Sequence, residues 1–303
     1  MITSKLYCFK LKLLNAKLCN LLALCLGLIF IQLPASSQQT DVNNLLKDRN
    51  GDNVFSMIAF GDSITYGVGD GTAPGEAVAV VPITDGRLGY TSRVERIMKV
   101  PVKNSGDPGE ELGTRGIRRL ASALRAYPAD VLLFLQGTND YFTRESTDIM
   151  TIRYQQVVNI ARSLGIEPVL MTMPLSCCGH SGVTAYTRYF SNGVRSVSSA
   201  NTVSRVDLER AWETTCNDVL RCNLLNLPEG LHPNTLGYDV MAQMVIGNLY
   251  NLNPLVAGNN TQIETALGLP AGSIVVKPEP ATTTKVDYGN MSAVDTAVSS
   301  SID

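Results

Sequence analysis

The sequence lacks several features that would assign it to a common functional class. Lys and Arg form no basic stripe, because the arginines of one predicted helix alternate with core positions (Arg115, Arg118, Arg119 and Arg125). A nucleic-acid partner is therefore not expected. The Gly- and Pro-rich segment Gly67–Arg87 is not followed by Gly-Lys-Ser/Thr, which excludes a phosphate-binding loop of that type. No internal repeat is evident.

Histidine is also scarce, with two residues in the whole chain, His180 and His232. A zinc site would combine His180 with the nearby Cys177, but their spacing matches no standard ligand pattern. No metal site is predicted.

The first 37 residues have the layout of a secretory signal. Four lysines precede the apolar stretch Leu21–Leu33, and small and polar residues follow it. Cleavage near Ser37 or Gln38 would remove these four from the 25 basic residues, leaving 21 against 27 acidic ones and a net charge of about −6. This layout predicts a secreted or periplasmic protein with no membrane span after signal removal. An uncleaved N-terminal membrane anchor is the alternative.

Three of the seven cysteines leave with the signal (Cys8, Cys19 and Cys25). The remaining four suggest up to two disulfides in an exported protein, with three possible pairings. A bridge between Cys216 and Cys222 is sterically easy. The adjacent Cys177 and Cys178 are not expected to bridge each other, because the geometry would be strained.

Short apolar runs alternate with longer amphipathic stretches along the rest of the chain. The apolar runs predict strands at Ser56–Phe60, Val100–Lys103, Asp130–Gln136, Glu167–Met173 and Val203–Leu208. Helical periodicity falls between or after them, at Tyr90–Met98, Leu112–Ala126, Asp148–Leu164 and Asn234–Tyr250. Continuously apolar strands that alternate with helices predict a three-layer α/β/α sandwich with a mainly parallel five-stranded sheet.

These patterns divide the chain into four parts. A signal at 1–37 is followed by a lead-in at 38–54, a folded domain at 55–252 and a tail at 253–303. The tail is rich in Thr, Ala, Ser, Pro and Asn and has no periodicity, so it is predicted to be largely disordered. The sequence makes no prediction of an oligomeric state.

Four polar segments carry residues suited to catalysis: Gly61–Ser63, Lys103–Glu111, Gln136–Phe142 and Pro228–Asn234. Each alone is typical of a turn or a helix cap. Together they supply a serine, exposed backbone N–H groups, a side-chain amide, and a histidine with an acid three residues before it. That set contains a nucleophile, a base with its orienting carboxylate, and donors for an oxyanion.

These segments resemble the four sequence blocks of the SGNH hydrolases, also called GDSL-type esterases and lipases. The blocks are "FGDSITYG", "NSGDPGE", "GTND" and "EGLHPN", in the family's order from Ala59 to Asn234. The resemblance implies the flavodoxin-like fold of that family and a serine esterase. It also implies a small-molecule or glycan ester as the substrate, with no metal or organic cofactor.

The resemblance also implies a role for each matching residue. Ser63 would be the nucleophile and His232 the base. The oxyanion hole would consist of the Ser63 and Gly109 N–H groups and the Asn139 side-chain amide. Gly109 is preferred over Gly106, because "PGE" stands where the family has its donor glycine.

One position departs from the family pattern, since the usual acid is Asp and this chain has Glu229. The acid accepts a hydrogen bond from Nδ1–H of the catalytic histidine and stabilises the imidazolium. The extra methylene of Glu229 requires the loop or the ring of His232 to shift. A backbone carbonyl that orients His232 is the alternative.

An exported serine esterase is therefore the leading interpretation. An acyltransferase or a carbohydrate O-deacetylase would use the same triad, and a non-catalytic binding module would keep only the fold. Selectivity is expected to reside in Gly67–Arg87 and Pro174–Tyr186. His180 in the second segment is interpreted as a solvated loop histidine, with lining of the substrate mouth as the alternative.

Overall fold

The computed structural model describes residues 45–74, 81, 86–216 and 222–250. One sheet contains five parallel strands in the order β2-β1-β3-β4-β5. Their bounds are β1 Met57–Gly61, β2 Val102–Gly106, β3 Val131–Leu135, β4 Glu167–Met171 and β5 Ser204–Val206. Every residue of β1 and β3 is buried, as expected of central strands covered on both faces. The predicted five-stranded parallel sheet is confirmed, in the flavodoxin-like strand order.

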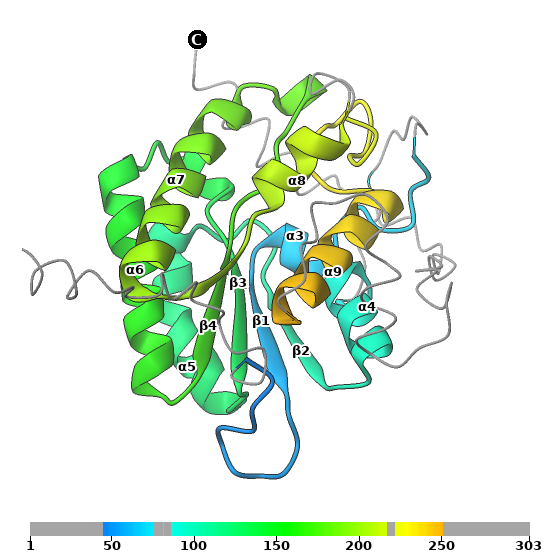
Figure 1. Cartoon of the computed structure of the whole chain (residues 1–303). Helices are drawn as coiled ribbons and strands as arrows, with labels where there is room; N and C mark the ends of the chain where they lie inside the picture. The colour runs from blue at the N-terminus through cyan, green and yellow to red at the C-terminus, as the bar shows by residue number, and fades with distance from the viewer. Residues whose placement is uncertain (1–44, 75–80, 82–85, 217–221, 251–303) are drawn as a thin grey trace, which may run out of the picture. The chain divides into compact units, whose positions relative to one another are not determined.

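Helices cover both faces of this sheet (Figure 1). The α-helices are α3 Ser63–Tyr66, α4 Gly89–Met98, α5 Ile117–Ala126, α6 Thr147–Ser163, α7 Val183–Asn201, α8 Leu208–Thr215 and α9 Thr235–Leu249. Shorter turns of helix are η1 Leu112–Gly116, η2 Asn139–Tyr141 and η3 Cys178–His180. Helices α5, α6 and α7 pack side by side on one face, and α4, α8 and α9 lie on the other. This is the predicted three-layer arrangement.

Right-handed crossovers explain this distribution of helices. The chain runs from β1 through α4 to β2 at one edge, then returns over β1 through α5 to β3 and continues outward. The reversal occurs between β1 and β3, which is the topological switch point where ligands bind in sheets of this kind. The aromatic rings of Phe60 in β1 and Phe134 in β3 stack in the core beneath this point, 6.0 Å apart.

Three α-helices have no counterpart in the sequence prediction, namely the short α3 together with α7 and α8. Helix α7 exposes Tyr186 and Tyr189 and buries the small polar residues Thr187, Ser191 and Ser198, so its apolar stripe is interrupted. The last four residues of Pro174–Tyr186, the segment in which selectivity is expected to reside, form the first turn of this helix. Helix 112–126 is observed, but its first five residues form a π-helical turn, η1.

Several predictions concern residues outside the described ranges. The signal at 1–37, residues 38–44 of the lead-in and the tail at 253–303 are among them. Residues 75–80 and 82–85 of the Gly- and Pro-rich segment also lie outside the described ranges. Within the described residues, no helix combines the length and apolar character needed to span a bilayer.

Candidate active site

Three of the four polar segments follow the ends of adjacent strands. Gly61, the last residue of β1, pairs with Gly106 of β2 on one side and with Leu135 of β3 on the other. The segments that follow these three residues therefore emerge together at the carboxyl edge of the sheet, at the switch point.

Ser63 is the first residue of the short helix α3. Asp62 caps this helix, because its Oδ1 accepts a hydrogen bond from the Ile64 N–H at 3.0 Å. The strand end is tightly packed, since a Cβ on Gly61 would lie 2.0 Å from the carbonyl oxygen of Leu135. Cap and packing together fix the start of the helix, and with it the backbone position of Ser63.

The fourth segment places a histidine against this serine. His232 Nε2 lies 2.8 Å from Ser63 Oγ, and His232 Nδ1 lies 2.8 Å from Glu229 Oε1. Serine, imidazole and carboxylate thus form a continuous hydrogen-bonded chain. It contains all three residues that the sequence nominated for a triad.

The extra methylene of Glu229 is accommodated by its own loop. Glu229 Oε2 accepts hydrogen bonds from the backbone N–H groups of Leu231 and His232, both at 2.9 Å. The side chain therefore turns back over the loop, and this presents Oε1 to His232 Nδ1. The carboxylate, and not a backbone carbonyl, is the group that contacts Nδ1.

Electrostatics keep this carboxylate ionised. Burial acts to raise the pKa of Glu229, but the attraction of His232 and the hydrogen bonds from His232 and Leu231 outweigh it and lower the pKa. A carboxylate that stays charged can hold the Nδ1–H tautomer of His232, and in that tautomer Nε2 can accept a proton.

Asn226, which the sequence did not nominate, closes the loop that carries Glu229 and His232. Its backbone N–H donates to the His232 carbonyl at 2.9 Å, and its carbonyl accepts from the Gly230 N–H at 2.7 Å. Its side-chain amide reaches the carbonyl of Gly69 at 3.3 Å. A buried amide that binds its own loop and a second loop leaves no signal in the sequence beyond being an Asn near the motif.

The glycine and asparagine segments meet through Glu110. Asn139 Nδ2 donates to the Glu110 carbonyl at 3.1 Å, which fixes the amide beside the turn that contains Gly109. Gly109 has φ +73°, and among the described residues, its two chain neighbours aside, no heavy atom lies within 4 Å of the position its Cβ would take. Gly106 differs, since a Cβ there would lie 2.3 Å from the Tyr66 nitrogen. Gly106 therefore packs against α3, whereas the turn at Gly109 is open.

A buried ion pair supports this turn, and no pattern in the sequence indicates it. Glu110 is 1% exposed, and its two carboxylate oxygens accept from Arg119 Nε at 2.7 Å and Arg119 Nη2 at 2.6 Å. Gln136 Nε2 adds a hydrogen bond to the same carboxylate at 2.9 Å. The Arg119 guanidinium also stacks 4.0 Å from the ring centroid of Phe60.

Two further buried carboxyls lie beside the site. Burial raises the pKa of Asp62 to about 7 and that of Asp140 to about 6. Asp140 accepts hydrogen bonds from the Leu112 and Gly113 N–H groups, both at 2.8 Å, and so holds the start of η1. Asp62 Oδ2 contacts no donor among the described residues.

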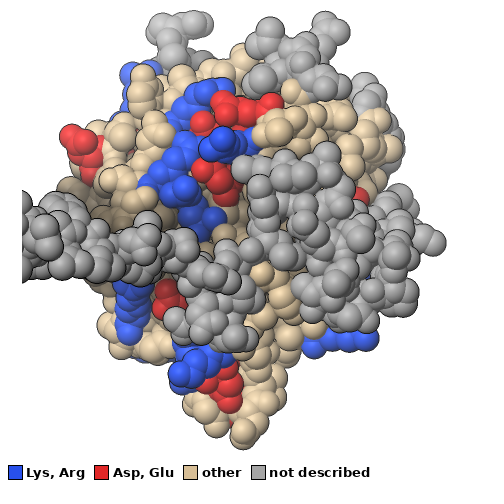
Figure 2. Space-filling view, viewed as in Figure 1, with Lys and Arg blue, Asp and Glu red and all other residues tan. Residues whose placement is uncertain are grey.

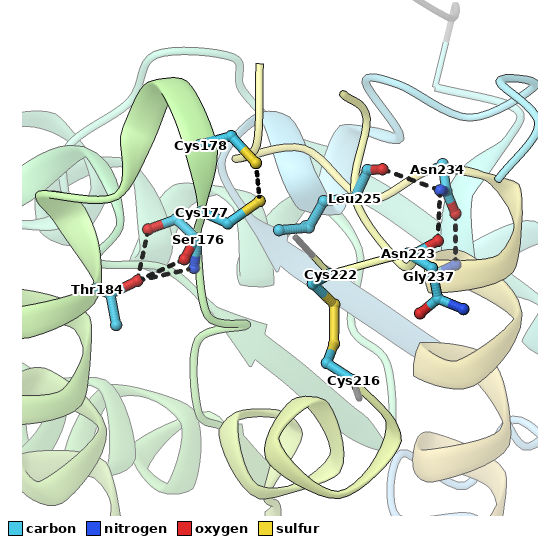
Figure 3. Close-up of a disulfide and its surroundings, with 10 residues drawn as sticks. All are labelled: Ser176, Cys177, Cys178, Thr184, Cys216, Cys222, Asn223, Leu225, Asn234 and Gly237. Atoms are coloured by element: carbon cyan, nitrogen blue, oxygen red, sulfur yellow. Dashed lines mark hydrogen bonds between the residues drawn. A yellow bond between two sulfur atoms is a disulfide. The ribbon is translucent and has the colours of Figure 1, made fainter. Parts of the chain in front are cut away.

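The cysteines separate into two groups (Figure 3). A disulfide joins Cys216 to Cys222, the pairing identified as sterically easy. The Sγ atoms of Cys177 and Cys178 lie 2.6 Å apart on a neighbouring loop. Burial raises the pKa of the Cys177 thiol, so it is a poor nucleophile at neutral pH.

Charged side chains of both signs share the face shown in Figure 2. Ion pairs connect α7 with α8 and with its N-cap residue, for example Arg188 with Glu213 at 2.8 Å and Arg195 with Asp207 at 2.7 Å. In the described ranges, no group of three or more His, Cys, Asp or Glu residues is arranged to hold a metal ion.

Comparison with known families agrees with this geometry. The family described as GDSL-like Lipase/Acylhydrolase matches residues 59–240, more than half of the chain and all four polar segments. The chain belongs to this family. As a GDSL-like acylhydrolase it is an enzyme that hydrolyses ester bonds, which sets aside the non-catalytic binding module. Comparison with curated proteins gives no match.

Solved structures show the same fold as this GDSL-like chain. A lipase/acylhydrolase from Enterococcus faecalis has a TM-score of 0.52 at 20% identity, over 66% of this chain and 98% of that one. A catalytic mutant of an acetylxylan esterase from Geobacillus stearothermophilus has a TM-score of 0.52 at 18% identity, over 64% and 94%. An alpha/beta hydrolase enzyme from the metagenome of Lake Arreo has a TM-score of 0.51 at 16% identity, over 66% and 96%.

Proposed function

We propose that this GDSL-like hydrolase is an exported serine esterase that cleaves carboxylic esters through Ser63, His232 and Glu229. The single observation that carries the proposal is the unbroken pair of 2.8 Å contacts from Ser63 Oγ to His232 Nε2 and from His232 Nδ1 to Glu229 Oε1. Distances of this size allow direct proton transfer from the nucleophile to the base.

In the acylation step, Ser63 Oγ attacks the ester carbonyl carbon while His232 Nε2 accepts the hydroxyl proton. Negative charge develops on the former carbonyl oxygen. The backbone N–H groups of Ser63 and Gly109 and the amide of Asn139 would donate to it. The tetrahedral intermediate then collapses, the ester C–O bond breaks, and the alcohol leaves with the proton from His232.

In the deacylation step, water takes the place of the alcohol. His232 removes a proton from the water as it attacks the acyl carbon, and then returns that proton to Ser63 as the acid leaves. Glu229 stays ionised throughout and stabilises the imidazolium in both steps, in keeping with the lowered pKa of its carboxyl. No step requires a metal or an organic cofactor.

Export rests on the sequence of the first 37 residues, with their lysines, apolar stretch and small-residue exit. The disulfide between Cys216 and Cys222 suits an oxidising compartment and so supports the proposal. Fractionation of expressing cells, followed by N-terminal sequencing of the mature protein, tests it. A membrane-bound protein with an intact N-terminus would contradict cleavage.

The test of the reaction is hydrolysis of short-chain p-nitrophenyl esters and acetylated xylan by the mature protein and by Ser63→Ala. We expect the variant to lose at least about a thousandfold in kcat, because the nucleophile is gone. The remaining oxyanion donors account for any residual activity. Equal kcat values in the two proteins would refute the assignment. Assay of the products in the presence of an added alcohol distinguishes release of the free acid from transfer to an acceptor.

A further inference from the structure

Both histidines of the chain lie against Glu229. His232 contacts Oε1 of the side chain, as described above. His180 belongs to a second segment, Cys177–His180. Its Nδ1 lies 2.8 Å from the Glu229 backbone carbonyl and 3.7 Å from Glu229 Oε1. The interpretation of His180 as a solvated loop histidine is therefore wrong, since its side chain is 20% exposed and bonded to the loop of the proposed acid.

The partner atom decides which nitrogen of His180 carries the proton. A carbonyl oxygen can only accept a hydrogen bond, so Nδ1 must be the protonated nitrogen in the contact with Glu229. The positive end of this N–H also faces Oε1, although at 3.7 Å it is too far for a hydrogen bond. The Nδ1–H of His180 thus holds the backbone of Glu229 and favours its negative charge.

The contact belongs to a clamp between two loops. Three consecutive carbonyls of the acid loop each accept one hydrogen bond from the segment Cys177–His180. The Pro228 carbonyl accepts from the Gly179 N–H at 3.1 Å, the Glu229 carbonyl from the His180 ring at 2.8 Å, and the Gly230 carbonyl from the Cys177 N–H at 2.7 Å. His180 provides the only side-chain donor of these three.

The two loops are packed backbone against backbone. A Cβ on Gly230 would lie 2.1 Å from the Cys177 carbonyl oxygen. The clamp segment is in turn fixed to the first turn of α7, because Thr184 Oγ1 donates to the Ser176 carbonyl at 2.7 Å and contacts Ser176 Oγ at 2.9 Å (Figure 3). Ser176 Oγ donates to the His180 carbonyl at 2.8 Å. These hydrogen bonds fix the backbone of His180, and with it the position of its Nδ1–H donor.

We propose that His180 is a positioning residue for the catalytic acid, holding the backbone of Glu229 so that its longer side chain keeps Oε1 within reach of His232. The inference rests on the proposed triad. A glutamate has one more rotatable bond than an aspartate, so more of its geometry depends on where the loop places its backbone. Small displacements of catalytic groups cost large factors in rate.

The test compares His180→Ala with His180→Asn in hydrolysis of p-nitrophenyl acetate. We expect His180→Ala to lower kcat about five- to tenfold with little change in KM, because one hydrogen bond to the acid loop is lost. His180→Asn should recover most of the loss, since an asparagine Nδ2 can occupy the place of the histidine Nδ1. Ser181→Ala is the matched control, because Ser181 directly follows His180 and its side chain is exposed. Its kcat should equal that of the wild type.

A double-variant cycle shows whether His180 acts through Glu229. If it does, His180→Ala should cost nothing further in a Glu229→Ala background. Thermal denaturation of each variant separates loss of positioning from loss of folding. A purely structural role would lower Tm, would change KM as well as kcat, and would not be repaired by Asn.

The outcomes distinguish failure of this inference from failure of the proposed function. A wild-type kcat in His180→Ala, together with an impaired Glu229→Ala, would overturn the role of His180 alone. Equal losses in the Ala and Asn variants would also overturn it. A wild-type kcat in Glu229→Ala would refute the acid of the proposed triad, and the role of His180 with it.

Discussion

Replacement of Glu229 by Gln should abolish most of the activity while leaving the fold intact. The glutamine keeps the length of the side chain, so its carbonyl oxygen can still accept from the Leu231 and His232 N–H groups that now bind Oε2. Its NH2 group then faces His232 Nδ1. An amide N–H cannot accept the Nδ1 proton, so the ring must adopt the other tautomer, in which Nε2 carries the proton.

That tautomer cannot remove the proton from Ser63. Loss of the correct tautomer in a serine triad costs on the order of 10⁴ in kcat, and we expect Glu229→Gln to lose a factor of this size. Glu229→Asp keeps the charge but is one methylene shorter, so it should lose one of the three hydrogen bonds that the carboxylate accepts. The loss of one charge-assisted hydrogen bond is worth about 2 kcal/mol, or about thirtyfold in kcat.

The assay is steady-state hydrolysis of p-nitrophenyl acetate, with circular dichroism to verify folding. Glu213→Gln is the matched control, because it makes the same change at a half-exposed residue of α8, remote in sequence from the motif segments. The expected order of kcat is wild type and control, then Asp, then Gln. A Glu229→Gln enzyme within about tenfold of the wild type would refute the tautomer argument.

Two further predictions concern buried carboxyls near the site. Since burial raises the pKa of Asp62 to about 7, this residue destabilises the fold increasingly as pH rises from about 4 to 7. Asp62→Asn should therefore remove about 2 kcal/mol of the decrease in unfolding free energy between about pH 5 and 8. Urea titrations that show the same decrease in both proteins would contradict this. Arg119→Met leaves the buried Glu110 carboxylate without its cation, so it should lower the unfolding free energy by about 3 kcal/mol and reduce kcat. Stability should be recovered in the double variant with Glu110→Gln, and no recovery in that variant would contradict the ion pair between Arg119 and Glu110.

The sequence predicted those parts of the structure that depend on local pattern. Continuous apolar runs identified the buried strands, and the four motifs identified Ser63, His232 and Glu229, which the structure brings within hydrogen-bonding distance. Helix α7 was missed because its buried face contains Thr and Ser, which weaken the apolar periodicity.

The supporting residues were not predicted, because their significance depends on partners distant in sequence. Arg119 has the pattern of a solvated helix residue, yet it pairs with Glu110 and lies over Phe60. Asn226 and His180 have no pattern of their own, and each is defined by the loop that it binds. A single sequence does not specify such long-range polar contacts, whereas the tertiary structure does.

The most direct test of Ser63 as the activated nucleophile is the site of covalent modification by a fluorophosphonate, which reacts with activated serines. Intact-mass and peptide mass spectrometry of the inactivated enzyme should show one adduct, located on Ser63, with loss of activity in proportion to labelling. Ser63→Ala and His232→Ala should both fail to react, because the first lacks the nucleophile and the second its base. Labelling at another residue, or undiminished labelling of Ser63 without His232, would contradict a Ser63 nucleophile activated by His232.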